Sequence, residues 1–184
     1  MKSAPPVLQG QKTRLRPLRE DDLVLVQRWF NDPEVRHWLH QSDRPDATLE
    51  TVREHFWRPV AEGRAIAWVI ETPDGQPTGT LRLLEIDRHH GRAELAISIG
   101  ETEQWDRGLG TDAIQLALVH AFQTLGLRRV GLITDADNSR GIRCYEKAGF
   151  VREGLLRSHR LRYGKPIDML AMAVLKEDWE IIPA

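Results

Sequence analysis

The sequence predicts a mixed α/β domain whose sheet is antiparallel except for a single parallel step in its middle. Between residues 65 and 99, apolar and polar residues alternate with a period of two in three runs joined by short turns. A long helical pattern comes next, and an apolar run typical of a buried strand follows it. Because a strand, a crossover helix and another strand in this order form a parallel pair, the parallel step is expected around this helix.

Length and composition indicate one ordinary globular domain. The chain has 184 residues, of which 41% are hydrophobic, and a formal net charge of −1, which argues against disorder and against a nucleic-acid-binding surface. We expect one domain over residues 1–184, with a flexible N-terminus over residues 1–11. No apolar run is long enough to span a membrane and the N-terminus lacks the apolar core of a signal peptide, so we expect a cytoplasmic protein.

The N-terminal part of the chain predicts one strand and three helices. Residues 13–18 alternate like a short edge strand, where Pro17 is tolerated. Helices are expected to begin near residues 19, 33 and 48. Asp32 before Pro33, and Thr48 before an apolar pattern, are good helix caps.

Residues 65–71, 78–86 and 92–99 then predict three strands, which short turns make antiparallel neighbours. In the third strand Glu94 shares a face with Ala96 and Ser98, on the side away from the more apolar face.

The segment after residue 108 predicts a long amphipathic helix that stops at Gly126. A strand over residues 129–134 is expected to be buried on both faces. A short helix capped by Asn138 and ended by Gly149 follows it, and residues 151–157 and 167–175 predict a final hairpin.

Two glycines at the start of the long helix predict a main-chain anion site. Gly108 and Gly110 let the backbone turn so that N–H groups converge at the positive end of the helix dipole. A nucleoside triphosphate loop would need Lys and Ser/Thr directly after the last glycine, where this chain has Thr111 and Asp112. A dinucleotide fingerprint fits Gly108, Gly110 and Ala113, but the loop before them is too long for the tight turn that it needs.

Two blocks of sequence carry a resemblance to a known family. The segment 105–111, WDRGLGT, and the segment 138–150, NSRGIRCYEKAGF, resemble the pyrophosphate loop and a downstream motif of the GNAT superfamily of acetyl-CoA-dependent N-acyltransferases. The likeness is to its ribosomal-protein and polyamine acetyltransferase branches and covers roughly residues 78–175. Trp105 stands where the general pattern has Gln or Arg. The resemblance implies the GNAT fold, with a splayed parallel pair at the centre of the sheet.

The resemblance also implies how acetyl-CoA, as the co-substrate, is held. The loop would bind the pyrophosphate through main-chain amides, basic side chains would reach phosphates, and the pantetheine arm would run along the strand that ends at Ile99. The residues implied in cofactor binding are Ile97, Ser98, Ile99, Trp105, Asp106, Arg107, Gly108, Leu109, Gly110, Thr111, Asn138, Arg140 and Lys147. Arg107, Arg140 and Lys147 could equally be solvated surface charges, and Asn138 only a helix cap.

Acetyl transfer needs a proton donor for the departing thiolate and an acceptor for the proton of the amine. Tyr145 is the candidate acid, because a phenol with a pKa near 10 stays protonated at neutral pH. Glu94 is the candidate base because its strand lies beside the expected thioester path. Glu34 and Asp135 are weaker candidates. An aromatic packing role for Tyr145 and an ordinary exposed position for Glu94 are the alternatives.

The sequence predicts no metal site and no acyl-enzyme. The histidines show no ligand spacing with cysteines or acids. Cys144, the single cysteine, excludes an internal disulfide and is typical of a small buried side chain rather than a nucleophile. The seven histidines are His37, His40, His55, His89, His90, His120 and His159.

The acceptor amine is not specified by the sequence. Trp29, Trp38 and Trp57 could line a pocket for a cationic amine, or could belong to the core. The candidates are a polyamine or aminoglycoside-like amine and a protein N-terminus. A non-catalytic acyl-CoA sensor is the alternative function, and a homodimer is left open.

Overall fold

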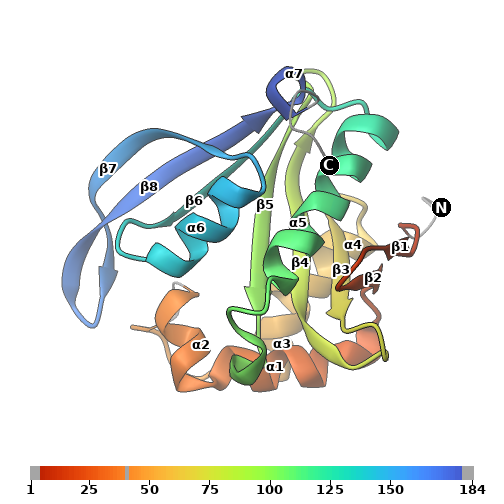
Figure 1. Ribbon diagram of the computed structural model, residues 1–184. Helices are drawn as coiled ribbons and strands as arrows, with labels where there is room; N and C mark the ends of the chain where they lie inside the picture. The colour runs from red at the N-terminus through yellow and green to blue at the C-terminus, as the bar shows by residue number, and fades with distance from the viewer. Residues whose placement is uncertain (1–4, 40–41, 180–184) are drawn as a thin grey trace.

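The computed structural model describes residues 5–39 and 42–179 and contains an eight-stranded sheet with the order β1-β2-β3-β4-β5-β6-β8-β7 (Figure 1). Its only parallel neighbours among these strands are β5 and β6, which confirms the predicted fold class. The strands are β1 (Leu8–Gln9), β2 (Arg14–Pro17), β3 (Ile66–Glu71), β4 (Pro77–Asp87), β5 (Arg92–Ile99), β6 (Arg129–Asp135), β7 (Val151–Arg162) and β8 (Lys165–Leu175).

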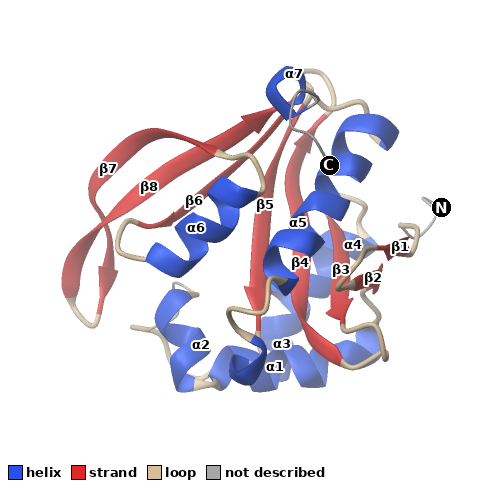
Figure 2. Ribbon diagram, viewed as in Figure 1, coloured by secondary structure: helices blue, strands red, loops and turns tan. Residues whose placement is uncertain are grey.

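Helices cover both faces of this sheet (Figure 2). The helices α5 and α6 pack on one face, and α1, η2 and α3 pack on the other with a separate apolar core. The helical elements are η1 (Glu20–Asp22), α1 (Leu23–Asn31), α2 (Pro33–Trp38), α3 (Leu49–Val52), the π-helical η2 (Arg53–Trp57), α4 (Arg58–Ala61), η3 (Thr102–Gln104), α5 (Leu109–Val119), the π-helical η4 (His120–Thr124), α6 (Ser139–Lys147) and α7 (Lys176–Trp179).

The predicted caps are present. The carboxylate of Asp32 accepts hydrogen bonds from the first turn of α2, and Thr48 caps α3 through the N–H of Thr51 at 3.1 Å. Gly126 has a φ of 69°, in the left-handed region that glycine adopts without strain, and it follows the last helical turn before β6.

The parallel pair at the centre of the sheet is splayed. The strands β5 and β6 are in register at three residue pairs only, from Arg92 opposite Arg129 to Glu94 opposite Gly131. Beyond that point β5 continues to Ile99 and β6 to Asp135 without pairing to each other, while β6 stays paired with β8 along its other edge. The edge of β5 from residue 95 to 99 therefore lacks a strand partner on the β6 side.

Residues 8–11, which belong to the N-terminus expected to be flexible, contact the rest of the fold. Strand β1 pairs with β2, and the side chain of Asp112 on α5 accepts hydrogen bonds from the main-chain N–H groups of Gln11, Lys12 and Thr13 at 2.9–3.3 Å. A contact between residues 100 positions apart leaves no local pattern in the sequence. Residues 1–4 lie outside the described part of the chain.

Two further expectations need correction. Strand β2 is not an edge strand, because β1 covers it. Strand β6 is not buried on both faces, since Ile133 is 46% exposed where β6 diverges from β5. Within the described residues, no helix has the length and apolar character needed to cross a membrane.

Candidate active site

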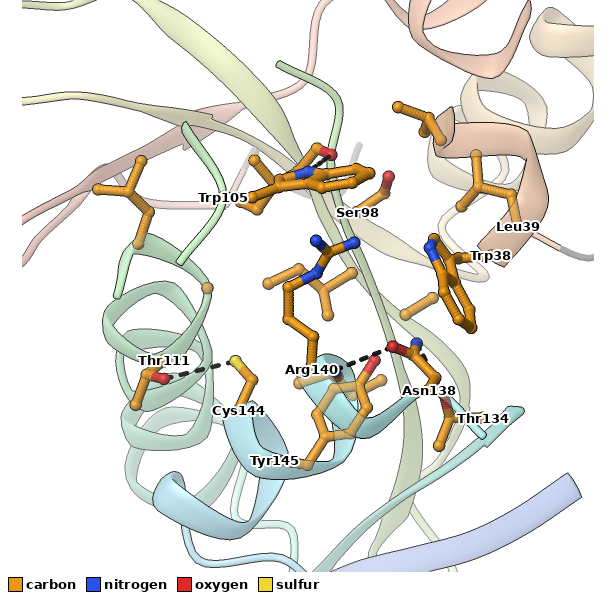
Figure 3. A pocket seen from close by; sticks show the side chains of 18 of the residues that line it. Trp38, Leu39, Ser98, Trp105, Thr111, Thr134, Asn138, Arg140, Cys144 and Tyr145 are labelled. Carbon is orange, nitrogen blue, oxygen red and sulfur yellow. Dashed lines mark hydrogen bonds between the residues drawn. The ribbon is translucent and has the colours of Figure 1, made fainter. Parts of the chain in front are cut away.

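A cavity of about 420 Å³ lies at the splay between β5 and β6. One part of its wall comes from β5, the start of α5, the end of β6 and α6, and the other from α1, α2, η2 and β4. Figure 3 shows Trp105, Arg140 and Tyr145 along the first part, with Trp38 and Leu39 at the right of the view. We call these two parts the loop side and the acceptor side.

The loop before α5 presents unpaired main-chain donors to the cavity. Gly108 is the N-cap of α5, with a φ of 82°, and Asp106 before it has a φ of 61°. No side chain among the described residues caps α5. The first N–H groups of a helix have no intrahelical acceptor, so the turn of Gly108, Leu109 and Gly110 at the cavity wall has the geometry expected of a main-chain anion site.

Trp105, which departs from the usual motif, makes two contacts that position the loop. Its indole Nε1 donates to the carbonyl of Ile99 at 2.9 Å and so fastens the loop to the end of β5. The guanidinium of Arg140 stacks over the same ring at 3.6 Å from the centroid. Trp105 therefore holds the loop and Arg140 at a fixed position relative to the cavity.

Three basic side chains of α6 line the loop side. Arg140, Arg143 and Lys147 follow at steps of three and four residues, which places them on one face of the helix. None of them has a carboxylate partner in residues 5–39 and 42–179, so their charge is free for an anionic ligand. Sequence reasoning missed Arg143, although the helical spacing from Arg140 would have indicated it.

Tyr145 also lies on α6, in the wall of the cavity. Burial raises its pKa above the ordinary tyrosine value, so its hydroxyl is protonated at neutral pH. Asn138 caps α6, with Oδ1 accepting from the N–H of Gly141 at 3.0 Å, and its Nδ2 donates to Thr134 Oγ1 at 3.3 Å. The helix-cap interpretation of Asn138 is therefore confirmed.

The acceptor side is mainly apolar and aromatic. It consists of Phe30, Val35, Trp38, Leu39, His55, Phe56 and Arg82. Of the three tryptophans considered as lining for an amine pocket, Trp38 lines the cavity. Trp29 is buried with an exposed fraction of 4%, and Trp57 packs against the same core. Sequence reasoning missed His55, Phe56 and Arg82, because only the fold brings η2 and β4 to the splay.

A sequence model described as an acetyltransferase (GNAT) domain matches residues 12–151. The chain belongs to the GNAT acetyltransferase family. It is 31% identical over 171 residues to the spermidine N(1)-acetyltransferase of Escherichia coli (strain K12), which covers 92% of this chain and 89% of that protein. It is 28% identical over 174 residues to the uncharacterised N-acetyltransferase YoaA of Bacillus subtilis (strain 168), which covers 93% of this chain and 97% of that protein.

The fold is also that of solved GNAT enzymes. The spermidine N-acetyltransferase of Vibrio cholerae, in complex with CoA and spermine, superposes with a TM-score of 0.82 at 24% identity, covering 91% of this chain and 98% of that one. GNAT acetyltransferases use acetyl-CoA, and the chain is accordingly an acyltransferase.

The loop side fits acetyl-CoA in charge and hydrogen bonding. The start of α5 and the three cations of α6, which have no cap and no carboxylate partner among the described residues, suit phosphate groups. Ile97, Ser98 and Ile99 line the cavity on the part of β5 that has no β6 partner, so its N–H and C=O groups suit the amides of a pantetheine arm. Asp106 and Thr111 complete the wall beside this loop.

Cys144 is poorly suited to nucleophilic catalysis. Its Sγ lies 3.4 Å from Thr111 Oγ1, and burial raises the pKa of the thiol. A raised pKa lowers the thiolate fraction at neutral pH, and the thiolate is the nucleophile. Gly110 is packed close to this sulfur, since a Cβ there would lie 3.1 Å from Sγ.

The structure does not bring every predicted residue to the cavity. Glu94 is exposed, belongs to the last β5–β6 pair, and does not line the wall. Arg107 is exposed as well, and its carbonyl accepts from Lys12 Nζ at 3.3 Å. Asp135 is buried in ion pairs with Arg160 and Arg162, which removes it as a base.

Glu34 lies in a second hollow of about 330 Å³, which shares Trp38 and Trp105 with the main cavity.

In the described part of the chain, no group of three or more His, Cys, Asp or Glu side chains could hold a metal ion. His40, one of the histidines considered as possible metal ligands, lies outside the described residues.

Proposed function

We propose that this chain transfers the acetyl group of acetyl-CoA directly to a primary amine while both substrates are bound. The observation that carries the proposal is the cavity at the splay, which has anion-binding groups on the loop side and an apolar surface on the acceptor side. Two ligands can therefore meet at β5 without a covalent enzyme intermediate.

Acetyl-CoA supplies an activated thioester, and the chain supplies its binding and the proton transfers. Main-chain N–H groups of residues 108–111 bind the diphosphate, and Arg140, Arg143 and Lys147 bind phosphate oxygens. The free edge of β5 aligns the pantetheine arm, with Ser98 near its end. The hydroxyl of Tyr145 donates a proton to the departing sulfur, which its raised pKa permits at any physiological pH.

The amine must lose a proton before it attacks, because an alkyl ammonium has a pKa near 10.4. Glu94 is four residues from Ser98 along β5, or about 13 Å at 3.3 Å per residue, which is too far for direct transfer. We propose that water in the cavity takes the proton and that the exposed carboxylate of Glu94 is its final acceptor. The effect of Glu94 on the rate should then be small.

The names of the relatives make polyamines the first acceptors to test, with peptide N-termini next. The test uses the purified chain, acetyl-CoA and a panel of spermidine, aminoglycosides, amino acids and short peptides. Thiol release measures turnover, and mass spectrometry identifies an acetylated product. We expect turnover with at least one primary amine and none with the matching tertiary amine.

Binding of acetyl-CoA without turnover for the whole panel would favour the sensor alternative. Isothermal calorimetry with acetyl-CoA separates that result from simple misfolding, because an inactive but folded chain still binds the cofactor.

A further inference from the structure

Arg82 lies on the acceptor side and has no carboxylate partner in the part of the chain that the structure describes. It projects from β4, where it is in register with Ala96 of β5, two residues from Ser98. The side chain is half-buried and lines the cavity. Its position is therefore next to the strand at which the two substrates meet.

The contacts of Arg82 leave most of its hydrogen-bonding capacity unused. Its Nη1 donates to the carbonyl of His55 at 3.0 Å, and its guanidinium stacks over the ring of Phe56 at 3.9 Å from the centroid. In residues 5–39 and 42–179 it forms no ion pair. A guanidinium carries several further N–H donors in a planar fork that matches a carboxylate.

Other arginines with little exposure are paired. Arg16, with 13% of its side chain exposed, binds Asp22 and Glu71, and Arg160, with 11% exposed, binds Asp135. Burial lowers the pKa of Arg82 to about 10, so the group is still cationic at neutral pH although it is poorly solvated. A half-buried cation of this kind is stabilised when an anion binds to it.

The charges around Arg82 are unfavourable for a polycation. The single acid in the described wall of the cavity is Asp106, which belongs to the loop side. Glu34 lies in the neighbouring hollow beyond Trp38 and Trp105. An extended polyamine in the main cavity would place an ammonium group near Arg82, where like charges repel.

We propose that the acceptor is a primary amine that also carries a carboxylate, and that Arg82 binds this carboxylate while the apolar body of the acceptor packs on Phe30, Val35 and Trp38. The proposal rests on the acetyl transfer proposed above. The carboxylate belongs to a free amino acid or to an acidic side chain near a peptide N-terminus. In both cases the guanidinium fixes the orientation in which the amine reaches the thioester.

The test compares matched acceptors on the wild-type chain. Free leucine and phenylalanine are paired with their carboxamides, and a short peptide that begins with Ser-Asp is paired with one that begins with Ser-Asn. For one of these pairs, we expect kcat/KM to be at least tenfold higher for the member that carries the carboxylate. The pair that shows this difference tells whether the carboxylate belongs to a free amino acid or to an acidic side chain of a peptide. A charge-assisted hydrogen bond to a buried partner accounts for a factor of about 10 to 100.

Variants assign that preference to Arg82. In Arg82→Gln the preference should disappear, while the KM for acetyl-CoA stays within about twofold. Arg82→Lys keeps the charge and should retain part of the preference. Calorimetric titration of the preferred acceptor into the CoA-bound protein should show the same loss of affinity in Arg82→Gln. Thermal melting of both variants checks that they fold.

Glu34→Gln is the matched control, because Glu34 belongs to the neighbouring hollow. If spermidine is acetylated faster than every carboxylate, and Glu34→Gln reduces that rate while Arg82→Gln does not, the inference is wrong and the proposed function stands. If no amine of any class is acetylated although acetyl-CoA binds, the proposed function itself fails. Equal rates for the two members of every pair would also overturn the role of Arg82.

Discussion

The two sides of the cavity differ in how they are built. The loop side comes from two stretches that lie near each other in the sequence, residues 95–111 and 133–147, and its binding groups are main-chain amides and basic residues at helical spacing. The acceptor side draws one or two residues each from α1, α2, η2 and β4. Local sequence therefore determines the cofactor site, whereas the acceptor site depends on the packing of distant segments.

The two sides also differ in specificity, since the loop side binds phosphate in general and the acceptor side recognises a particular ligand. Main-chain amides bind phosphate whatever side chains surround them, so the loop side tolerates a substitution such as Trp at position 105. The acceptor side recognises its ligand through side chains alone. One charged residue, Arg82, can then change the class of acceptor without altering the fold.

The largest effect is expected on the loop side, at Tyr145. Tyr145→Phe removes the proton donor for the departing sulfur but keeps the ring, so kcat should fall by a factor of about 100 or more. The KM for acetyl-CoA should stay within about twofold. Steady-state kinetics measures both, and an unchanged kcat would exclude Tyr145 as the acid.

The pH dependence gives a second test of the same residue. An acid acts in its protonated form, so a raised pKa of Tyr145 extends activity toward high pH. We expect kcat to rise as the amine loses its proton and to show no decline up to pH of about 10, the ordinary tyrosine pKa. A decline well below pH 10 would mean that the catalytic acid titrates there and is another group.

A glycine substitution tests the main-chain anion site. Gly108→Ala forces a side chain into the left-handed region, which costs about 1–2 kcal/mol, so the affinity for acetyl-CoA should fall by a factor of about 5 to 30. Gly75→Ala is the matched control, since Gly75 has a φ of 86° in a distant turn and a Cβ added there would meet no atom within 4 Å. Calorimetry should show weaker cofactor binding for Gly108→Ala only.

A smaller effect is expected from one α6 cation. Arg143→Gln removes a single exposed charge, so the KM for acetyl-CoA should rise by a factor of about 3 to 10 at low salt, and the difference should shrink at high salt. Arg152→Gln is the control, because Arg152 pairs with Glu146 and does not line the cavity. Equal effects of the two variants would show that only net charge matters.

The smallest effect is expected at Glu94. Glu94→Gln should lower kcat/KM by a factor of no more than about 3, because water can pass the proton to bulk solvent without it. A decrease of about 100-fold, together with a shifted acidic limb of the pH profile, would show that Glu94 is the direct base and that the cavity closes around it when substrates bind.

The sequence predicted most of the fold and the loop side, for identifiable reasons. Alternation, turns and caps are local signals, so the strands, the helix capped by Asn138 and the glycine loop are where the patterns place them. The position of β1 was missed because it depends on Asp112, which is distant in the sequence. Arg82 was missed because an arginine in a strand is normally exposed, and only its neighbours His55 and Phe56 make it unusual.

The free edge of β5 has a consequence for the stability of the protein as a whole. A ligand that occupies the gap between β5 and β6 connects two parts of the sheet that are otherwise in register at three residue pairs. Such a ligand stabilises the folded state by RT ln(1 + [L]/Kd), or about 2.7 kcal/mol at one hundred times its Kd. The lifetime of the folded chain would then follow the supply of its thioester, and exhaustion of that supply would expose the sheet to unfolding at its centre.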